Sequence, residues 1–395
     1  MVVRCILIYV LKYLFIALFF FIIGSALSFA TPIKNTAVYS GNTLGAEIQS
    51  HSLQIIGFQP YWLFSTANTT YHSYIHTFSY FGLVINTDGS IKKLTNHTEE
   101  EPGWTTLNLD KTQSLLKQLS DHKVQKSLVI HLASEDDIIE LMKDPKVNAQ
   151  TLLKEIIPIM ENNSFTNLNI DIESFIAQPQ ERRKAFTTFV QKISEAVHKK
   201  NITLTLSVAP KALTYPFLTD IPSLSKYTDT FVFMTYDYHY TGSSYAGPVA
   251  PIGGAGENRE MDVETSIQEA LKILPSQKVY MGVPFYGYEW DTLSNIPGSP
   301  TVFGTGKTAS NRRITNMLKD CATCITGIEK EGQQPYVITP SEDGKYFIQY
   351  FYEDAVSLQK KIDLAKKYKL GGIAIWALGY EDASMRDILE KQIKN

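Results

Sequence analysis

Short runs of β-branched and aromatic residues alternate with amphipathic stretches of helical period from about residue 54 onward. The first pattern is typical of buried strands and the second of helices that cover a sheet. Phe186, Phe189, Val190, Ile193 and Val197, for example, fall on one face of a predicted helix. The apolar runs predict eight strands, at residues 55–58, 75–80, 126–131, 168–173, 203–208, 231–236, 279–284 and 372–376.

Strand and helix alternating eight times predict an α/β fold, a (β/α)8 TIM barrel. Two stretches interrupt this alternation. The polar segment 84–108 contains Asp88-Gly89, a hairpin turn signal. Segment 286–353 is too long for one crossover helix, so we expect a small α+β insertion after the seventh strand that deepens the cleft. The predicted barrel domain then consists of residues 31–285 and 354–395. Within the insertion the pattern predicts a short helix at 313–319 and strands at 336–338 and 346–352.

The N-terminal segment has the order of a secretory signal peptide. Arg4 and Lys12 precede a long apolar run at 13–23, and the small-x-small triplet Ser28-Phe29-Ala30 follows. We expect residues 1–30 to be removed by cleavage after Ala30, which predicts a secreted or periplasmic protein. The alternative is an uncleaved membrane anchor, because the apolar run approaches the length of a membrane span.

Composition narrows the classes of partner. A formal net charge of −3 without basic runs argues against nucleic acid. The 22 tyrosines and 20 phenylalanines suit a cleft for sugars, or they fill a large core. After the leader, Cys321 and Cys324 remain, as a local disulfide or as free thiols. The eight histidines form no metal motif, so we expect them to be structural or surface groups. We expect no metal, no cofactor and a monomer.

The run Leu168–Glu173 is the most informative part of the chain for function. It reads as a buried strand on which Asp171 and Glu173 project to the same face, with Asn169 below them. Burying two acids side by side is costly unless they share a proton or take part in chemistry. Polar and aromatic residues also end the sixth, seventh and eighth predicted strands, where the active sites of barrels lie. They are Tyr236 and Asp237, Tyr286, and Trp376. Two acids, a tyrosine hydroxyl and an aromatic floor suit hydrolysis of a glycosidic bond.

With these motifs the chain resembles the family 18 glycoside hydrolases, the chitinase-like enzymes. The strand-four pattern DxxDxDxE is matched at Asp171 and Glu173, while Thr166 and Asn169 replace its first and middle aspartates. Strand six matches MxYD, strand seven matches GxPxYG at 282–287, and Trp376 matches the strand-eight tryptophan. The expected Gly-Gly of strand three is replaced by the segment 131–134. The residues within these motifs most resemble those of bacterial spore-germination and cortex-lytic members, which act on N-acetylglucosamine in peptidoglycan.

The resemblance implies a substrate-assisted retaining mechanism. Glu173 would be the general acid, Asp171 would hold the acetamido N–H, and Tyr236 would donate to the acetamido oxygen. Trp376 would form the floor under the −1 sugar. The other predicted substrate-binding residues are Asp237, Met234, Asn169, Tyr286 and Tyr61, and Trp62 and Trp290 either line sugar subsites or pack in the core.

We therefore expect an exported hydrolase of β-1,4-linked N-acetylglucosamine polymers, chitin or chitooligosaccharides. One alternative is a peptidoglycan N-acetylglucosaminidase. The other is a sugar-binding lectin on the same barrel, although such lectins typically lack the acid at the position of Glu173. We also expect that Asn169→Asp shifts the pH–rate profile and does not create activity.

Overall fold

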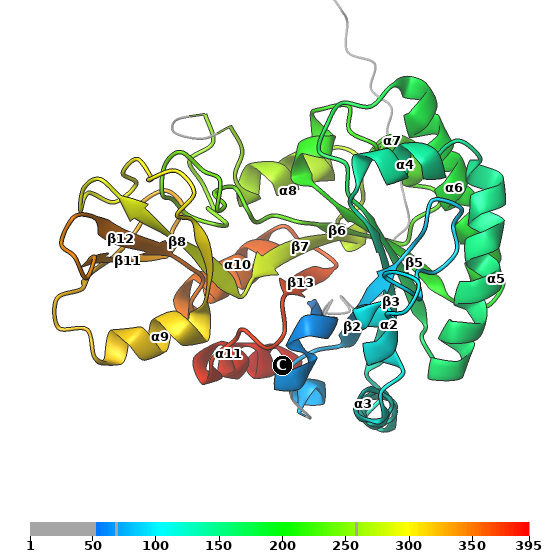
Figure 1. Cartoon of the computed structure of the whole chain (residues 1–395), viewed down its shortest axis with the longest axis horizontal. Coiled ribbons are helices and arrows are strands. Elements are labelled where there is room, and N and C mark those ends of the chain that lie inside the picture. The colour runs from blue at the N-terminus through cyan, green and yellow to red at the C-terminus, as the bar shows by residue number, and fades with distance from the viewer. Residues whose placement is uncertain (1–52, 68–69, 257–259, 395) are drawn as a thin grey trace, which may run out of the picture. The chain divides into compact units, whose positions relative to one another are not determined.

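Eight parallel strands close into a barrel in the part of the chain that the computed structural model describes, residues 53–67, 70–256 and 260–394 (Figure 1). The predicted TIM barrel is confirmed. The predicted leader lies outside the described residues, and none of the described helices is long and apolar enough to cross a membrane. The barrel strands are β1 (Gln54–Pro60), β2 (Thr77–Val84), β3 (Gln125–Leu132), β4 (Asn167–Ile172), β5 (Thr203–Val208), β6 (Thr230–Phe233), β7 (Val279–Pro284) and β13 (Gly372–Trp376).

Helices connect successive strands, and several begin at a capping side chain. The Asp262 carboxylate accepts from the backbone N–H of Thr265 at 2.7 Å, and Asp354 and Ser357 form a reciprocal capping box. The longer helices are α3 (Asp110–Asp121), α5 (Pro145–Asn163), α6 (Gln180–His198), α8 (Val263–Leu271), α10 (Ala355–Lys367) and α11 (Ala383–Lys394). The short ones are η1 (Tyr61–Thr66), η2 (Tyr71–Ser73), α2 (Pro102–Leu107), α4 (Glu135–Leu141), η3 (Pro210–Leu213), α7 (Ile221–Leu224) and η4 (Ser276–Lys278).

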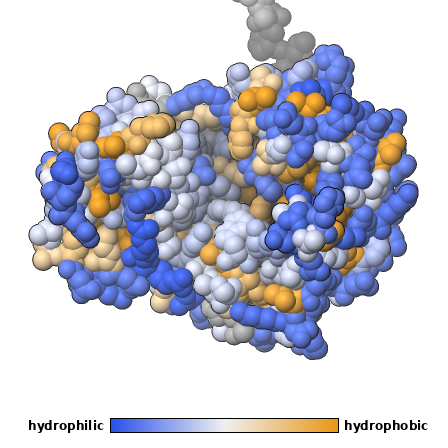
Figure 2. Space-filling view, in the orientation of Figure 1, coloured by the Kyte–Doolittle hydropathy of each residue, from blue (hydrophilic) through white to orange (hydrophobic). Residues whose placement is uncertain are grey.

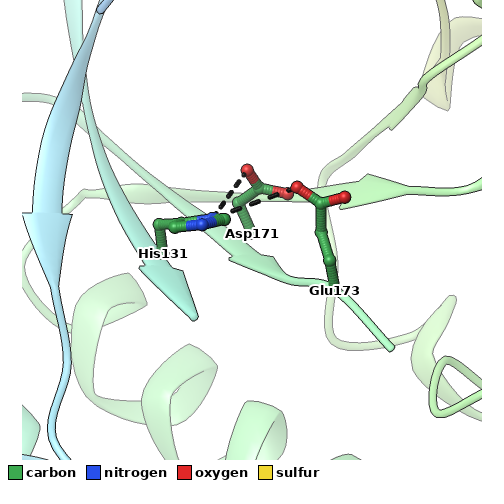
Figure 3. A group of neighbouring side chains, drawn as sticks. All are labelled: His131, Asp171 and Glu173. Atoms are coloured by element: carbon green, nitrogen blue, oxygen red, sulfur yellow. Dashed lines mark ion pairs between the residues drawn. The ribbon is translucent and has the colours of Figure 1, made fainter. Parts of the chain in front are cut away.

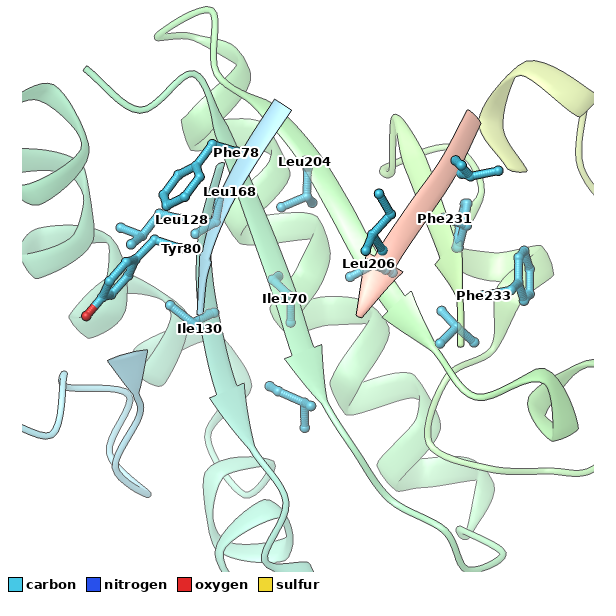
Figure 4. Close-up of a cluster of buried hydrophobic side chains, with 14 of the residues drawn as sticks. Phe78, Tyr80, Leu128, Ile130, Leu168, Ile170, Leu204, Leu206, Phe231 and Phe233 are labelled. Atoms are coloured by element: carbon cyan, nitrogen blue, oxygen red, sulfur yellow. The ribbon is translucent and has the colours of Figure 1, made fainter. Parts of the chain in front are cut away.

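Alternate residues of each barrel strand face the helices and the lumen. Figure 4 shows the outward set from β2 to β6 as large apolar side chains, which are almost fully buried. Burying one such side chain contributes roughly 1.5–3 kcal/mol. This layer makes the register of the strands unambiguous, because a slip by one residue would turn the apolar set into the lumen. The labelled members are Phe78, Tyr80, Leu128, Ile130, Leu168, Ile170, Leu204, Leu206, Phe231 and Phe233.

The lumen side of these strands is partly polar. Near the start of β4, the Asn167 side chain accepts from Ser127 Oγ at 2.6 Å and donates to Thr203 Oγ1 and Thr205 Oγ1, both at 2.9 Å. Two residues further along β4, Asn169 Oδ1 accepts a hydrogen bond from Ser207 Oγ at 3.1 Å. The barrel interior thus carries hydrogen-bonded side chains that lead up to the carboxyl ends of the strands.

A five-stranded antiparallel sheet, with order β10-β11-β12-β8-β9, follows β7 and lies beside the barrel (Figure 1, left). Its helix and later strands agree with the pattern in the sequence, and Cys321 and Cys324 form a disulfide after the helix. Apolar side chains gather on its surface in Figure 2. The exposed apolar residues of this segment include Leu293, Ile296 and Phe303. Its elements are β8 (Tyr286–Thr292), β9 (Lys307–Ser310), α9 (Asn311–Lys319), β10 (Ile325–Ile328), β11 (Pro335–Pro340) and β12 (Phe347–Phe351).

A fully buried ion pair joins this sheet to the barrel helices. Lys361 Nζ of α10 lies 3.0 and 2.9 Å from the two carboxylate oxygens of Glu353, and neither side chain is exposed. The Gln334 amide nitrogen donates to the same carboxylate, and its oxygen accepts from Ala250 N at 2.8 Å. The described residues of the barrel and of this sheet belong to one compact unit.

The polar segment after β2 folds back on itself, as its turn signal predicts. Gly89 adopts a φ of 85°, and Ile85 and Ile91 pair as an antiparallel bridge around the turn. A left-handed φ of this size favours glycine.

Candidate active site

The end of β4 places two carboxylates at the mouth of the barrel. Asp171 shares the lumen face with Asn169, while Leu168, Ile170 and Ile172 pack outward. Glu173 directly follows the strand, and its N–H donates to Leu132 O of β3 at 2.9 Å, which continues the pairing. Asp171 is 4 % exposed, and the Glu173 side chain is 21 % exposed.

His131 of β3 is the cross-strand neighbour of Asp171 in the parallel register. Its Nδ1 lies 3.4 Å from Asp171 Oδ2 and 4.0 Å from Glu173 Oε1 (Figure 3). Neither His131 Nδ1 nor Asp171 Oδ1 has a hydrogen-bond partner among the described residues. Buried polar atoms without partners are uncommon and often mark functional groups. The cluster is therefore close enough for strong electrostatic coupling and still has capacity for a ligand.

The pKa of Glu173 is raised to about 8. Burial is the largest cause, the negative charges of Asp171 and Asp237 act in the same direction, and His131 opposes them. Burial lowers the pKa of His131, but Asp171 and Glu173 outweigh that effect, so its pKa is raised. A glutamic acid that keeps its proton at neutral pH is suited to protonate a leaving group.

The segment after β6 brings a tyrosine and a third acid to the same space. The sequence predicts a strand to residue 236, but β6 ends at Phe233, and the chain turns at Thr235, whose hydroxyl donates to Gly282 O at 2.7 Å. A Cβ at Gly282 would lie 2.6 Å from Phe233 O and 2.8 Å from the Tyr236 ring, so only glycine permits this approach. The pKa of Tyr236 is raised well above its ordinary value by burial and by nearby carboxylates, which keeps its hydroxyl a donor.

Asp237 is held in place by two tyrosines of β8. Its Oδ1 accepts from the hydroxyls of Tyr286 at 2.5 Å and Tyr288 at 2.8 Å. Its φ of 60° is left-handed, a conformation that aspartate tolerates better than most residues. Two hydrogen bonds and an unusual backbone conformation fix the direction of this carboxylate.

Aromatic rings form the opposite part of the site. Trp376 at the end of β13 contacts Phe81, Phe58 and Trp62, with ring centroids 4.8, 5.9 and 6.2 Å apart. Trp62 is 48 % exposed, and Tyr61 packs edge-on against it at 5.0 Å. Flat apolar faces of this kind fit the C–H faces of a sugar ring.

These groups share one cavity of about 730 Å³, a size typical of ligand sites. The predicted residues that line it are Glu173, Asp171, Tyr236, Trp376, Asp237, Met234 and Tyr61, with Trp62. Loop residues that the motifs did not indicate also line it, among them Phe175, Phe217, Lys211 and Glu260.

Two predicted substrate contacts, Asn169 and Tyr286, lie outside the cavity, and the alternatives left open for Trp290 can be decided. Asn169 is 1 % exposed, lies beneath the cavity and binds Ser207, and Tyr286 is 4 % exposed and uses its hydroxyl on Asp237. Neither lines the cavity, so both support the groups that do. Trp290 is 1 % exposed with its indole N–H donated to Tyr240 O, which makes it a packing residue. Likewise, none of the insertion residues that the structure describes lines this cavity, so the expected deepening by the insertion is wrong.

His131 is the cavity residue beside both acids that sequence reasoning missed, because it was assigned with the structural or surface histidines. Its proximity to Asp171 depends on the pairing of two strands, and the replaced Gly-Gly motif was the signal that could have found it. The ligand atoms of His131, Asp171 and Glu173 lie within 4.8 Å of one another, as in a cation site. We interpret the trio as an electrostatically coupled cluster, in which the two carboxylates raise the pKa of His131 and His131 lowers that of Glu173.

Comparisons with known proteins agree with this geometry. Residues 45–381 match the model of the glycosyl hydrolases family 18. The chain is 27 % identical over 270 residues to the uncharacterized glycosylase YvbX of Bacillus subtilis, covering 66 % of this chain and 71 % of YvbX. It is 26 % identical over 253 residues to the cortical fragment-lytic enzyme of the same organism, covering 62 % of this chain and about half, 54 %, of that enzyme. The crystal structure of Ostrinia furnacalis Group IV chitinase has the same fold, with a TM-score of 0.73 at 17 % identity over 87 % of this chain and all of that one.

Proposed function

Because this chain belongs to the glycosyl hydrolases family 18, we propose that it cleaves β-1,4-linked N-acetylglucosamine polymers, chitin or chitooligosaccharides, by a substrate-assisted retaining mechanism. It is a glycoside hydrolase, and the proposal concerns its substrate and the roles of its residues. The observation that carries it is that Glu173, whose pKa is raised, lies beside Asp171 and lines one cavity with Tyr236 and Trp376.

In this mechanism Glu173 gives its proton to the glycosidic oxygen as the bond to the anomeric carbon breaks. The carbonyl oxygen of the substrate's own 2-acetamido group attacks that carbon and closes an oxazolinium ring. Asp171 accepts from the acetamido N–H, where positive charge develops, and Tyr236 donates to the acetamido oxygen. Water then opens the ring, Glu173 takes one of its protons, and the anomeric configuration is retained.

Asp171 suits an orienting role better than that of a nucleophile. It precedes Glu173 by two residues in the chain, and their ligand atoms lie within 4.8 Å of each other, whereas the acid and the nucleophile of a two-carboxylate enzyme flank the scissile bond. An N-acetylated sugar in the −1 position is therefore a requirement of the proposal.

Peptidoglycan is the second candidate substrate, supported by the similarity to a cortical fragment-lytic enzyme. Lys211 in the cavity wall, paired with Glu260 at 2.6 and 2.7 Å, also offers a cation for the carboxylates of the stem peptide that the lactyl group of N-acetylmuramic acid carries. With Lys211→Ala, cleavage of muropeptides would then fall severalfold more than cleavage of chitooligosaccharides.

The decisive experiment incubates the mature chain in parallel with chitooligosaccharides, a chromogenic chitobioside and peptidoglycan sacculi, and follows the anomer first released by NMR. We expect turnover with retained configuration, reduced about 10³-fold in Glu173→Gln. Inversion, or activity toward sugars without a 2-acetamido group, would contradict the mechanism. Binding without turnover by the wild-type chain would favour the lectin alternative.

We further propose that the protein is exported, from the charged and apolar order of its first 30 residues. N-terminal sequencing of the protein recovered outside the cytoplasm tests this, with Thr31 as the expected first residue. An intact N-terminus in the membrane fraction would indicate an anchor.

A further inference from the structure

Two departures from the family 18 motifs meet at the same carboxylate. Asn169 stands where the strand-four pattern has its middle aspartate, and His131 stands where strand three is expected to carry glycine. Asn169 precedes Asp171 by two residues on the same strand face, and His131 is its cross-strand partner. One departure removes an acidic neighbour of Asp171, and the other adds a basic one.

The removed acid has no substitute at its own position. The side-chain oxygen of Asn169 accepts from Ser207 Oγ at 3.1 Å, and an amide neither takes up nor releases a proton in the physiological range. Asp171 therefore shares no proton with the residue beneath it. The titratable groups that the structure places next to Asp171 are His131, Glu173 and Tyr236.

The surroundings of His131 favour its charged form. From β4 it faces Asp171 at 3.4 Å and Glu173 at 4.0 Å, while from β2 the Phe81 ring packs against it at 5.1 Å. Tyr236 and Asp237, from the segment after β6, belong to the same cavity wall as these acids. The pKa of His131 is raised by the two carboxylates in spite of its burial.

We propose that His131 is a positioning residue whose imidazolium holds the Asp171 carboxylate aimed at the acetamido N–H, in place of the acid that Asn169 replaces. This inference rests on the proposed hydrolytic function. The ion pair restrains Asp171, whose Oδ1 remains without a partner among the described residues and is free to accept from substrate. The same cation lies near Glu173, so it also stabilises the carboxylate that forms there.

The proton balance of one cycle follows. Before the reaction Glu173 carries the proton that it will donate, and in this proposal His131 is the cation beside Asp171. When Glu173 protonates the leaving oxygen, the trio gains one negative charge, which His131 partly offsets across 4.0 Å. When water opens the oxazolinium ring, Glu173 recovers a proton from that water. His131 keeps its proton throughout and so acts through Asp171 and Glu173.

The test replaces His131 by asparagine, which retains a hydrogen-bond donor without a charge. We expect kcat to fall about tenfold or more with KM changed less than about threefold, and both limbs of the pH profile of kcat/KM to move up by roughly one pH unit. The upward direction follows because a lost cation raises the pKa of both nearby carboxyl groups. The matched control is His198→Asn, which breaks a histidine–aspartate pair of 2.8 Å outside the cavity and should leave the profile in place.

A direct measurement on the wild-type chain keeps the inference separate from activity and from folding of the variant. The ring nitrogens of His131 are identified by NMR as the signals lost in His131→Asn, and both should be protonated at pH 7. A neutral His131 at pH 7, or an unshifted pH profile in a folded His131→Asn protein, would overturn the inference. If the chain turns over no substrate, the proposed function fails, while the NMR titration still decides the charge of His131.

Discussion

Two buried clusters in the described residues each pair a basic with an acidic side chain. They differ in how many of their polar atoms have hydrogen-bond partners. Lys361 and Glu353 lie at ordinary hydrogen-bond distances, and Gln334 adds a further bond. His131 and Asp171, by contrast, approach only to 3.4 Å and leave polar atoms without partners among the described residues. Burial of charge is common to both clusters, so it does not by itself indicate catalysis.

The two clusters differ in whether hydrogen-bonding groups remain available for a ligand. A closed network holds two segments together, and removing one member leaves a buried charge without a counter-charge. An open network beside a cavity keeps some hydrogen-bonding groups available for a ligand. The free-energy cost of burying those groups without partners is recovered only when the ligand binds. The same conservative substitution should therefore affect stability in one cluster and turnover in the other.

The largest expected effect is on stability, from Glu353→Gln. It leaves Lys361 buried with no anionic partner, and we expect the free energy of unfolding to fall by about 3–5 kcal/mol in urea denaturation. Activity per folded molecule should stay within about twofold, because neither residue lines the cavity. Adding Lys361→Met should recover much of the loss. Unchanged stability of the single variant would show that the closed network is dispensable.

In the open cluster, Asp171→Asn should act on catalysis. An amide cannot supply the negative charge that stabilises the oxazolinium ion, so we expect kcat to fall by about 10²–10³-fold. The unfolding midpoint should change less than in Glu353→Gln, because the ion pair lost with His131 is longer, at 3.4 Å, and the histidine side chain is 24 % exposed. Loss of stability with kcat retained would reverse the assignment of the two clusters.

A smaller effect should appear in the pH dependence of stability. Glu173 has a pKa of about 8 in the folded protein against an ordinary 4.5, so its raised value stabilises the fold fully below pH 4.5. As pH rises from 4.5 to 8, the unfolded chain ionises this residue first and that stabilisation is lost. Glu173→Gln should therefore raise Tm relative to wild type more at pH 8 than at pH 4. The control is Glu181→Gln, an exposed glutamate in the first turn of α6, whose effect should be similar at both values.

The smallest expected effect follows from Asn169→Asp, which introduces a third carboxyl group beneath the open cluster. Its negative charge should raise the pKa of Glu173 and move the alkaline limb of the pH–rate profile upward by about half a unit to one unit. The measurement is kcat/KM from pH 5 to pH 10, and Asn167→Asp, lower on the same strand, is the control. An unchanged profile would show that residue 169 is electrically remote from the acid.

The eight barrel strands were predictable because each has an apolar face that must be buried, and a short run of apolar residues in the sequence marks that face. The strand ends gave Asp171, Glu173, Tyr236 and Trp376 for the same reason. Contacts between strands were not predictable in this way. His131 joins the site only through the register of β3 with β4, and Trp290 looks like a cleft residue until the sheet around it is known.

The pair of Lys361 and Glu353 also sets limits on recombining this enzyme with its relatives. A chimera that removes the whole insertion, residues 286–353, takes Glu353 with it and would leave α10 with a buried cation and no counter-charge. A graft that moves the segment from β8 through Lys361 carries both charges together. The segment that must be exchanged is then longer than the insertion itself. Lineages that gain or lose the insertion should therefore change residue 361 in the same step.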